Sequence, residues 1–295
     1  MEISSNFVGT PLKPYVRSID WPEIMYFAAS VDDNNPYYFD DEREEGIVAP
    51  PMFSIIANWP IIKNINEHIE QELEEFPMEV LSTIVHYTEY LKIYRLIKPG
   101  DKLTIAGKII AILPHRAGTH IVVGLEVKDQ DDQLVSEEYI GGMLRGVECK
   151  GEGKVIEDFT QIPIFETQSE PSWKEIIHID TMKPYIYDAC TDLSVVPIHT
   201  SRQFAHLVGL PDIILHGTAT LALAIKIITN RELHGDPFHI REIACKFTGM
   251  VLPNTDIQLC LNGKTPSNDP EHYFFDIFNE EGRKTISQGY IKIGK

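Results

Sequence analysis

The sequence predicts an α+β fold built from two similar units in tandem. First, the chain repeats itself, because Pro36 in the first half and Pro197 in the second stand in matching corners, each followed by a predicted helix. Second, a strand with alternating apolar residues follows each helix, after Pro99 and Pro253 in corresponding places. Third, both halves close on a strand, an acidic turn and a strand, in HIVVGLEVKDQDDQLVSEEYIGGM and HYFFDIFNEEGRKTISQGYIKIG.

The domain boundary is predicted in the middle of the chain. The length of 295 residues suits two domains of ordinary size, and the 43% of hydrophobic residues can fill two cores. The stretch from Gly146 to Trp173 lacks sustained periodicity and carries glycine, proline and acidic residues. We therefore expect a first domain at residues 1–150, a linker at 151–172 and a second domain at 173–295.

Each half contains one long predicted helix. The first covers Pro51 to Phe76, and its acidic end, NEHIEQELEEF, is interpreted as a solvated face. The second covers Gly217 to Leu233 and is apolar on nearly all faces, which is typical of a buried helix. Its apolar part is too short to span a bilayer and runs directly into the polar residues TNRE. A core helix is therefore expected.

Composition and simple motifs exclude several classes of protein. Because 44 acidic residues outnumber 26 basic ones, the net charge of −18 argues against a nucleic-acid surface. The N-terminal segment shows neither a secretory signal nor a membrane anchor, so a cytoplasmic protein is expected. The four cysteines are scattered singly, which predicts neither disulfides nor a metal site. Nucleotide-binding and serine-hydrolase motifs do not occur.

The most informative segment runs from Tyr187 to Ala224. In it, a Pro-Ile-His corner that ends at His199 precedes His216 and Gly217, which open the apolar helix. The free amides and the positive dipole of a helix N-terminus suit a carbonyl oxygen that gains negative charge, such as that of a thioester. A neutral His199 could take a proton from water or from a carbon next to that carbonyl. This pairing suits the hydration of an enoyl thioester.

The segment resembles the MaoC-like R-specific enoyl-CoA hydratases. Their signature is Asp-x-Asn-Pro-(Leu/Ile)-His, then a loop, then His-Gly at the start of a central helix, and five residues fit it: Pro197, Ile198, His199, His216 and Gly217. The resemblance implies a double hotdog, in which each half is a long helix wrapped by an antiparallel sheet. It also implies reversible hydration of a trans-2-enoyl-CoA to an R-3-hydroxyacyl-CoA. Coenzyme A is then the carrier of the substrate, no other cofactor is expected, and a homodimer is expected.

Two positions depart from this signature. The family's asparagine falls on Val196 and its catalytic aspartate on Ser194, while the nearest upstream carboxylate, Asp192, comes two residues too early. Either Asp192 reaches the reacting water through a longer turn, or His199 works without a carboxylate, and we favour Asp192. The resemblance thus implies His199, Asp192 and the Gly217 amide as catalytic groups. The expected substrate-binding residues are Ser194, Val196, Pro197, His216 and Thr218, with His216 expected to pack at the helix start.

The first half resembles the family's N-terminal dehydratase-like domain. It keeps the Asp-x-Asn-Pro run from Asp33 to Pro36, but Tyr38 stands at the histidine position. Pro50 and Pro51 replace the His-Gly pair, and prolines have no N–H to donate. This half is therefore predicted to be non-catalytic and to shape the acyl pocket. A composite site of Asp33 with His199 is conceivable, although a pseudo-twofold relation of the halves would keep them apart.

Two other functions remain open. The departures at Ser194 and Val196 allow a non-catalytic acyl-CoA-binding protein or partner subunit, and a hotdog fold also serves thioesterases. Since CoA is polyanionic, its binding needs local basic residues in this acidic chain. The candidates are Lys226, Lys246, Arg202 and Arg241.

Overall fold

A computed structural model describes residues 1–69, 76–159, 162–163, 165, 170–265 and 271–294. The strands are β1 (Glu2–Ser4), β2 (Pro11–Ser18), β3 (Ile84–Ile93), β4 (Lys102–His115), β5 (Gly118–Lys128), β6 (Leu134–Arg145), β7 (Glu148–Lys150), β8 (Lys154–Val155), β9 (Trp173–Ile179), β10 (Ile240–Phe247), β11 (Thr255–Lys264), β12 (Glu271–Phe278) and β13 (Lys284–Ile293). The helices are α1 (Trp21–Ser30), α2 (Pro36–Phe39), α3 (Phe53–Lys63), α4 (Ile65–His68), α5 (Lys183–Thr191), α6 (Arg202–Leu207) and α7 (Gly217–Glu232), with the 3-10 turns η1 (Ser5–Phe7), η2 (Met78–Thr83) and η3 (Pro197–His199).

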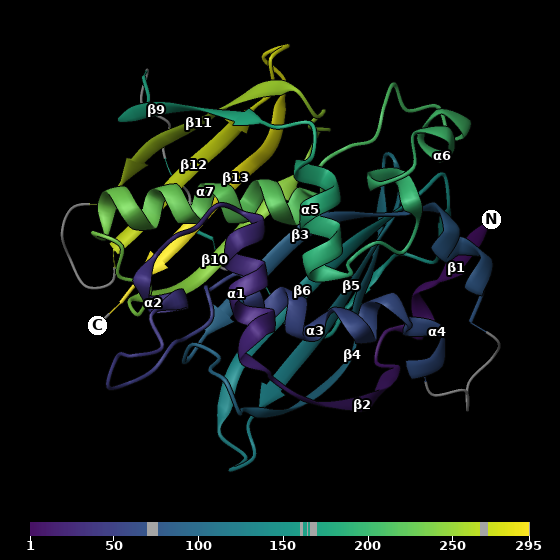
Figure 1. Cartoon of the computed structure of the whole chain (residues 1–295). Coiled ribbons are helices and arrows are strands. Elements are labelled where there is room, and N and C mark those ends of the chain that lie inside the picture. Colours follow the sequence, from purple (N-terminus) through teal and green to yellow (C-terminus); the bar gives the residue numbers. More distant parts are fainter. Residues whose placement is uncertain (70–75, 160–161, 164, 166–169, 266–270, 295) are drawn as a thin grey trace.

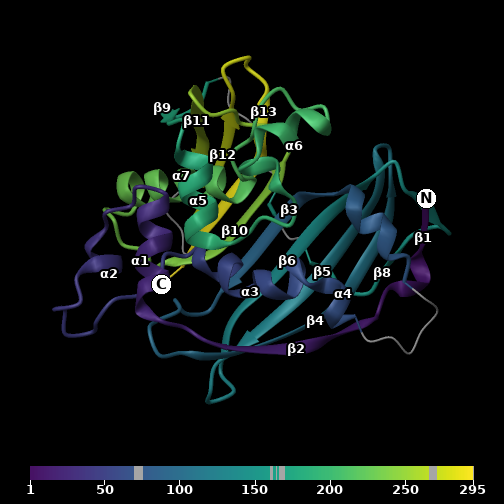
Figure 2. The ribbon, with the colours of Figure 1, turned by 45° about the vertical axis from the view of Figure 1, so that its right-hand side comes forward.

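One antiparallel sheet runs through both halves of the chain. Its strand order is β2-β4-β5-β6-β3-β10-β13-β12-β11-β9, with the short β8 added on β4. The halves join where β3 pairs with β10, with Leu91 opposite Ile243. The helices gather on one face of this sheet, with α3 in front of the first-half strands and α7 in front of the second-half strands (Figures 1 and 2). The predicted α+β repeat is thereby confirmed.

Helix α7 is the centre of the second half. The predicted helix from Gly217 to Leu233 is confirmed, since α7 ends one residue earlier, at Glu232. Ten of its sixteen residues are buried, which is more than a helix with a single buried face would bury. Lys226, although charged, reaches across to the first half and donates to the carbonyl oxygen of Val31 at 3.2 Å.

Helix α3 is shorter than predicted. The prediction of one helix from Pro51 to Phe76 is wrong in the described part, because α3 ends at Lys63, α4 adds only a single turn and Ile69 forms a β-bridge with Leu12. The end of that predicted helix, residues 70–75, lies outside the described residues. Pro60 also interrupts the hydrogen bonding of α3, leaving the carbonyl of Ile56 without its helical donor. Arg17 donates to that carbonyl from 3.3 Å.

The described part of the predicted linker contacts the sheet through a short strand and through two phenylalanines. Part of the linker, residues 160–161, 164 and 166–169, lies outside the described residues. In the rest, β8 pairs with β4, and Phe159 and Phe165 pack on a second apolar cluster around Tyr139 and Phe274. The rings of Phe165 and Phe274 stack at 4.4 Å. The limits of the two domains stay a prediction.

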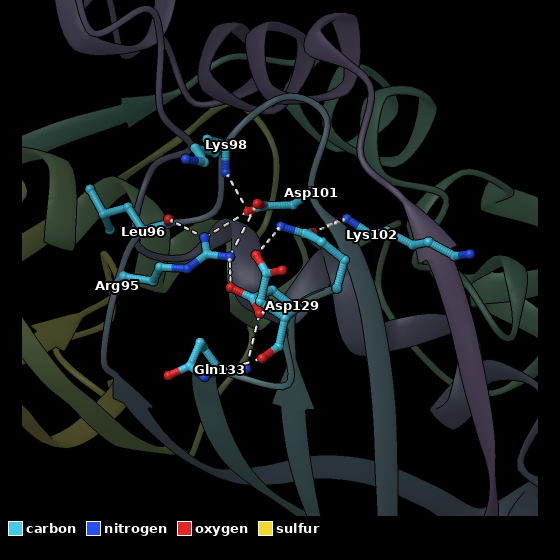
Figure 3. Close-up of polar contacts among 9 residues, drawn as sticks. Arg95, Leu96, Lys98, Asp101, Lys102, Asp129 and Gln133 are labelled. Carbon is cyan, nitrogen blue, oxygen red and sulfur yellow. Dashed lines mark hydrogen bonds and ion pairs between the residues drawn. The ribbon is translucent and has the colours of Figure 1, made fainter.

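Arg95 ties together two turns of the first half (Figure 3). Its guanidinium donates to both carboxylate oxygens of Asp101, at 2.7 and 3.1 Å, and to Asp129 at 2.8 Å. Asp101 is 1% exposed and also accepts from the amide of Lys98. Asp129 accepts from the amide of Gln133, which closes the turn between β5 and β6. One side chain thus links the β3–β4 turn to the β5–β6 turn.

We expect Arg95→Ala to lower the free energy of unfolding by about 2 to 3 kcal/mol, since it leaves buried Asp101 without its cation. Chemical denaturation with circular dichroism measures this. Arg116→Ala, on a turn of the same half, is the control and should change stability by less than about 0.5 kcal/mol. Equal effects of the two variants would contradict the expectation.

Two carboxyl groups lie buried side by side beneath α3. Glu89 on β3 pairs with Ile140 and Glu138 on β6 pairs with Leu91, so the two acids are diagonal neighbours on one face of the sheet. Both are fully buried, and Asn58 of α3 donates to Glu138. Burial raises the pKa of Glu89 to about 8, and burial together with the neighbouring Glu89 raises the pKa of Glu138 well above its usual value. The pair therefore keeps at least one proton at neutral pH.

This pair predicts a loss of stability as the pH rises. A carboxyl whose pKa is higher in the folded state stabilises the fold below its unfolded pKa, and this stabilisation disappears as the pH rises from about 4.5 to about 8. Glu89→Gln stays neutral, so it should flatten the pH dependence of the melting temperature over this range. Exposed Glu126→Gln is the matched control. Two results would contradict this expectation. One is a wild-type melting temperature that increases from pH 5 to 8, and the other is an equally steep pH dependence in Glu89→Gln.

Candidate active site

The candidate site lies where the chain passes from α5 to α7. Pro184 stands in the first turn of α5, where a missing N–H costs nothing. The last helical residue of α5 is Thr191. Asp192, which follows it, has a left-handed backbone (φ 51°) and reverses the chain. Asp188 is therefore in the last turn of α5, facing the loop that follows. Ser194 on that loop donates to Asp188 Oδ1 at 2.5 Å.

His199 is the last residue of η3, which Pro197 begins. Its Nδ1 lies 2.8 Å from the carbonyl oxygen of Ile214. Because a carbonyl can only accept, Nδ1 carries the proton and Nε2 keeps its lone pair. Burial, with a smaller contribution from His216, lowers the pKa of His199 to about 3. The imidazole is therefore neutral at physiological pH, in the form that can accept a proton.

The N-terminus of α7 completes the site. Thr220 N donates to the carbonyl of His216, so the amides before it in the first turn have no partner within the helix. Gly217, the first residue of α7, lies against Phe247 of β10, and a Cβ at this position would stand 2.7 Å from the Phe247 ring. A side chain at this position would therefore displace the Phe247 ring or the start of α7. Free amides and the helix dipole make this a place where an oxyanion would be stabilised.

His216 contacts both His199 and Asp188. Its ring stacks on that of His199, with centroids 3.5 Å apart and planes inclined by 21°. Its Nε2 lies 3.3 Å from Asp188 Oδ1 and 3.3 Å from Ser194 Oγ. Asp188, Ser194, His199 and His216 thus form one cluster at the start of α7, which we call the histidine cluster.

The charges of the histidine cluster follow from these contacts. The neighbouring His216 ring, helped by the hydrogen bond from Ser194, lowers the pKa of Asp188 to about 2, so Asp188 is ionised. Burial lowers the pKa of His216, while Asp188 acts in the opposite direction. Because the Ser194 hydroxyl donates its proton to Asp188, its oxygen accepts from His216 Nε2, and Nδ1 of His216 keeps a lone pair. This Nδ1 is buried and has no hydrogen-bond partner in the described part of the chain.

Asp192, the predicted carboxylate, lies outside the histidine cluster. Its side chain is 90% exposed and its Oδ1 accepts from Lys63 of α3 at 2.7 Å. The left-handed residue that ends α5 turns this side chain to the surface, and Asp188, one helical turn earlier, lies beside the histidines instead. Counting back along the chain from His199 missed Asp188. Reading KPYIYDACT as a short helix before a reversal would have revealed it.

The other predicted residues divide between the cluster and its surroundings. Ser194 and His216 belong to the cluster, and His216 does more than pack at the helix start. Thr218 is buried beside it and accepts from the hydroxyl of Tyr187 at 3.1 Å. Pro197 begins η3. Val196 is exposed and makes no contact that places it in the cluster.

The corresponding corner of the first half is closed. Asp33 is buried with a pKa raised by burial, and Tyr38 is 1% exposed. Both line a cavity of about 10 Å³, which also includes Lys226 of α7. Lys226 lies about 13 Å along α7 from its start by the rise of a helix. Asp33 therefore does not join His199 in a composite site.

The basic residues expected near CoA are only partly free. Lys226 donates to the carbonyl of Val31, and Arg241 donates to the carbonyl of Phe238. Arg202 forms an ion pair with Asp212 at 3.1 Å. Arg202 opens α6 directly after the loop that carries His199. Within the described ranges, no cluster of three or more His, Cys, Asp and Glu could hold a metal ion, and no helix is long and apolar enough to cross a membrane.

Fold and domain matches together define a double hotdog with two dehydratase-like domains. Residues 188–267 match the family described as MaoC like domain, and residues 6–138 match the FAS1-like dehydratase domain region. The chain therefore carries a MaoC-like dehydratase domain in its second half and a FAS1-like dehydratase region in its first half. The predicted MaoC-like domain of the second half and the predicted dehydratase-like first half are confirmed.

Solved structures agree on the fold. A MaoC-like dehydratase from Phytophthora capsici is similar with a TM-score of 0.80 and 18% identity, over 98% of each chain. A Mycobacterium tuberculosis protein described as having a double hotdog fold is similar with a TM-score of 0.60 and 11% identity, over 95% of this chain and 94% of that one. The predicted double hotdog is confirmed.

Two curated proteins are related in sequence. The Drosophila melanogaster peroxisomal multifunctional enzyme type 2 is 21% identical over 267 residues, which are 90% of this chain and 43% of that protein. The Arabidopsis thaliana peroxisomal enoyl-CoA hydratase 2 is 32% identical over 99 residues, covering 33% of this chain and 30% of that protein. The matched part is less than half of the length of either relative.

Proposed function

We propose that the protein catalyses the reversible hydration of a trans-2-enoyl-CoA to an R-3-hydroxyacyl-CoA. The observation that carries this proposal is the neutral His199, which stacks on His216 at the start of α7, where the first amides have no partner within the helix. The domain matches and the name of the Arabidopsis relative support a hydratase that acts on a CoA ester. The reaction needs no cofactor beyond CoA as the carrier of the substrate. A homodimer and a cytoplasmic location stay predictions.

In the proposed reaction, the thioester carbonyl accepts a hydrogen bond from the amide of Gly217. The helix dipole and this amide draw charge towards the carbonyl oxygen, which makes C3 electrophilic. His199 Nε2 takes a proton from water while the oxygen bonds to C3, and the proton is then delivered to C2. Water is added across the double bond, His199 ends neutral, and the reverse sequence is dehydration.

The test follows the absorbance of the enoyl thioester with a panel of short, medium, branched and aromatic 2-enoyl-CoAs. Loss of absorbance, with a 3-hydroxyacyl-CoA of R configuration as the product, would support the proposal and identify the acyl class. Binding of these esters without turnover would instead favour a non-catalytic acyl-CoA-binding protein. Release of free CoA thiol would favour a thioesterase, and either result would overturn the hydratase proposal.

A further inference from the structure

The histidine cluster contains one polar atom that the proposed reaction has not yet used. Nδ1 of His216 is buried, since the residue is 5% exposed, and it has no hydrogen-bond partner among the described residues. A buried acceptor without a partner costs roughly 1 to 3 kcal/mol. A small donor at this atom would remove that cost. Water is the smallest such donor, and it is a reactant in the proposed function.

The two imidazoles are fixed in complementary forms by different partners. The carbonyl of Ile214 accepts from His199 Nδ1 and leaves Nε2 as an acceptor. Ser194 Oγ donates its one proton to Asp188, so it accepts from His216 Nε2 and leaves Nδ1 of His216 as an acceptor. The two rings stack with centroids 3.5 Å apart, so each contributes one acceptor nitrogen to the start of α7. One water molecule has two protons to donate to two such acceptors.

We propose that His199 and His216 together hold the reacting water, and that Asp188 is the carboxylate of the site, acting as a positioning residue through His216. This inference rests on the hydratase function proposed above. The water donates one proton to His199 Nε2 and the other to His216 Nδ1. His199 removes the first proton as the oxygen bonds to C3, and that proton passes to C2. His216 and Asp188 keep their protonation states throughout.

Ser194 has a defined part in this arrangement. Its hydroxyl donates to Asp188 Oδ1 at 2.5 Å and lies 3.3 Å from His216 Nε2, so it holds the carboxylate oxygen against the ring. Tyr187 also lies near His216, with ring centroids 5.2 Å apart, and its hydroxyl donates to Thr218. The orientation of His216 is thus set by α5, the following loop and α7 together.

The decisive variant is Asp188→Asn, because an amide can donate to Nε2 and so stabilise the tautomer with the proton on Nδ1. In a serine protease, the same change at the buried aspartate that orients the catalytic histidine lowers kcat about ten-thousandfold. The reason is that the histidine adopts the wrong tautomer. We expect a loss of at least about a hundredfold in kcat here, with a smaller change in KM. Ser194→Ala should lower kcat by about tenfold, and Asp188→Glu should retain more activity than Asp188→Asn.

Asp192→Asn is the matched control, since Asp192 is a carboxylate one helical turn away that is exposed and bound to Lys63. It should leave kcat within about twofold of wild type. The proposal would be overturned if Asp188→Asn had the kcat of the wild type, or if Asp192→Asn lowered kcat more than Asp188→Asn does. Thermal melting checks that each variant folds, and Ser194→Ala carries the test if Asp188→Asn does not fold.

A second readout does not depend on turnover. Nitrogen-15 NMR of labelled histidines distinguishes the protonated from the unprotonated ring nitrogen. In the wild type, His216 should carry its proton on Nε2, and in Asp188→Asn the proton should move towards Nδ1. A wild-type His216 protonated on Nδ1 would overturn the inference even in an active enzyme. If NMR finds the expected tautomers but the wild-type protein hydrates none of the enoyl-CoA esters, only the proposed reaction is refuted.

Discussion

Replacing His199 by alanine should lower kcat for enoyl-CoA hydration about a thousandfold, the usual contribution of a well-placed general base. The reason is that His199 Nε2 is the only acceptor of the proposed site that takes a proton from water. Stability should fall by only about 1 kcal/mol, because His199 is partly exposed and loses one hydrogen bond, to Ile214. The absorbance assay and a thermal melt measure both quantities.

The control for this variant is His206→Ala. His206 is an exposed histidine on α6, whose Nε2 contacts the carbonyl of Pro211 at 3.1 Å. Its removal should leave kcat unchanged. A His199→Ala enzyme that keeps a tenth or more of wild-type kcat would show that another group is the base. The pH profile adds a check: since burial lowers the pKa of His199 to about 3, activity should not fall through the usual histidine range near pH 6.

Gly217→Ala has the second largest expected effect. The added Cβ would stand 2.7 Å from Cδ1 of Phe247, so the ring or the start of α7 must move. Overpacking of this kind costs about 1 to 3 kcal/mol. Displacement of the Gly217 amide removes a donor to the oxyanion, and the loss of one such donor lowers kcat by about a hundred- to a thousandfold. Steady-state kinetics and chemical denaturation measure the two losses.

The double variant Gly217→Ala/Phe247→Leu tests the steric cause. The smaller leucine makes room for the Cβ, so the double variant should recover stability and at least about tenfold in kcat relative to Gly217→Ala. Phe247→Leu alone is the reference for the cycle. If Gly217→Ala is as active as wild type, the start of α7 does not receive the carbonyl. If the double variant recovers stability but no activity, the amide position depends on more than Phe247.

Much of the fold could be predicted from the sequence because its signals are local. The apolar run after Gly217 allowed nothing but a buried helix, and α7 has those bounds within one residue. Alternating strands around an acidic turn predicted the closing hairpins, which the structure has as β5–β6 and β12–β13. The first long helix was not predictable in this way. Its acidic end is helical in composition, yet α3 ends at Lys63, only the single turn α4 follows, and Ile69 bridges to Leu12.

The candidate site shows where local signals stop. His199 and Gly217 could be found because each is fixed by its neighbours in the chain, one by the Pro197 corner and the other by the start of a helix. The carboxylate could not, because its place depends on how α5 packs beside α7. Asp192 is nearer to His199 along the chain, but it follows the reversal that ends α5 and points to Lys63.

The sequence alone thus determined two tandem α+β units, the buried helix of the second unit, the Pro197 corner that carries His199 and a helix N-terminus at Gly217, since periodicity and local backbone geometry encode all of these. Only the tertiary structure decided that Asp188 and Ser194 meet His216, that His216 stacks on His199, and that Phe247 closes against Gly217. These contacts join α5, a loop, α7 and β10. Their distances depend on packing between elements, which no pattern of adjacent residues specifies.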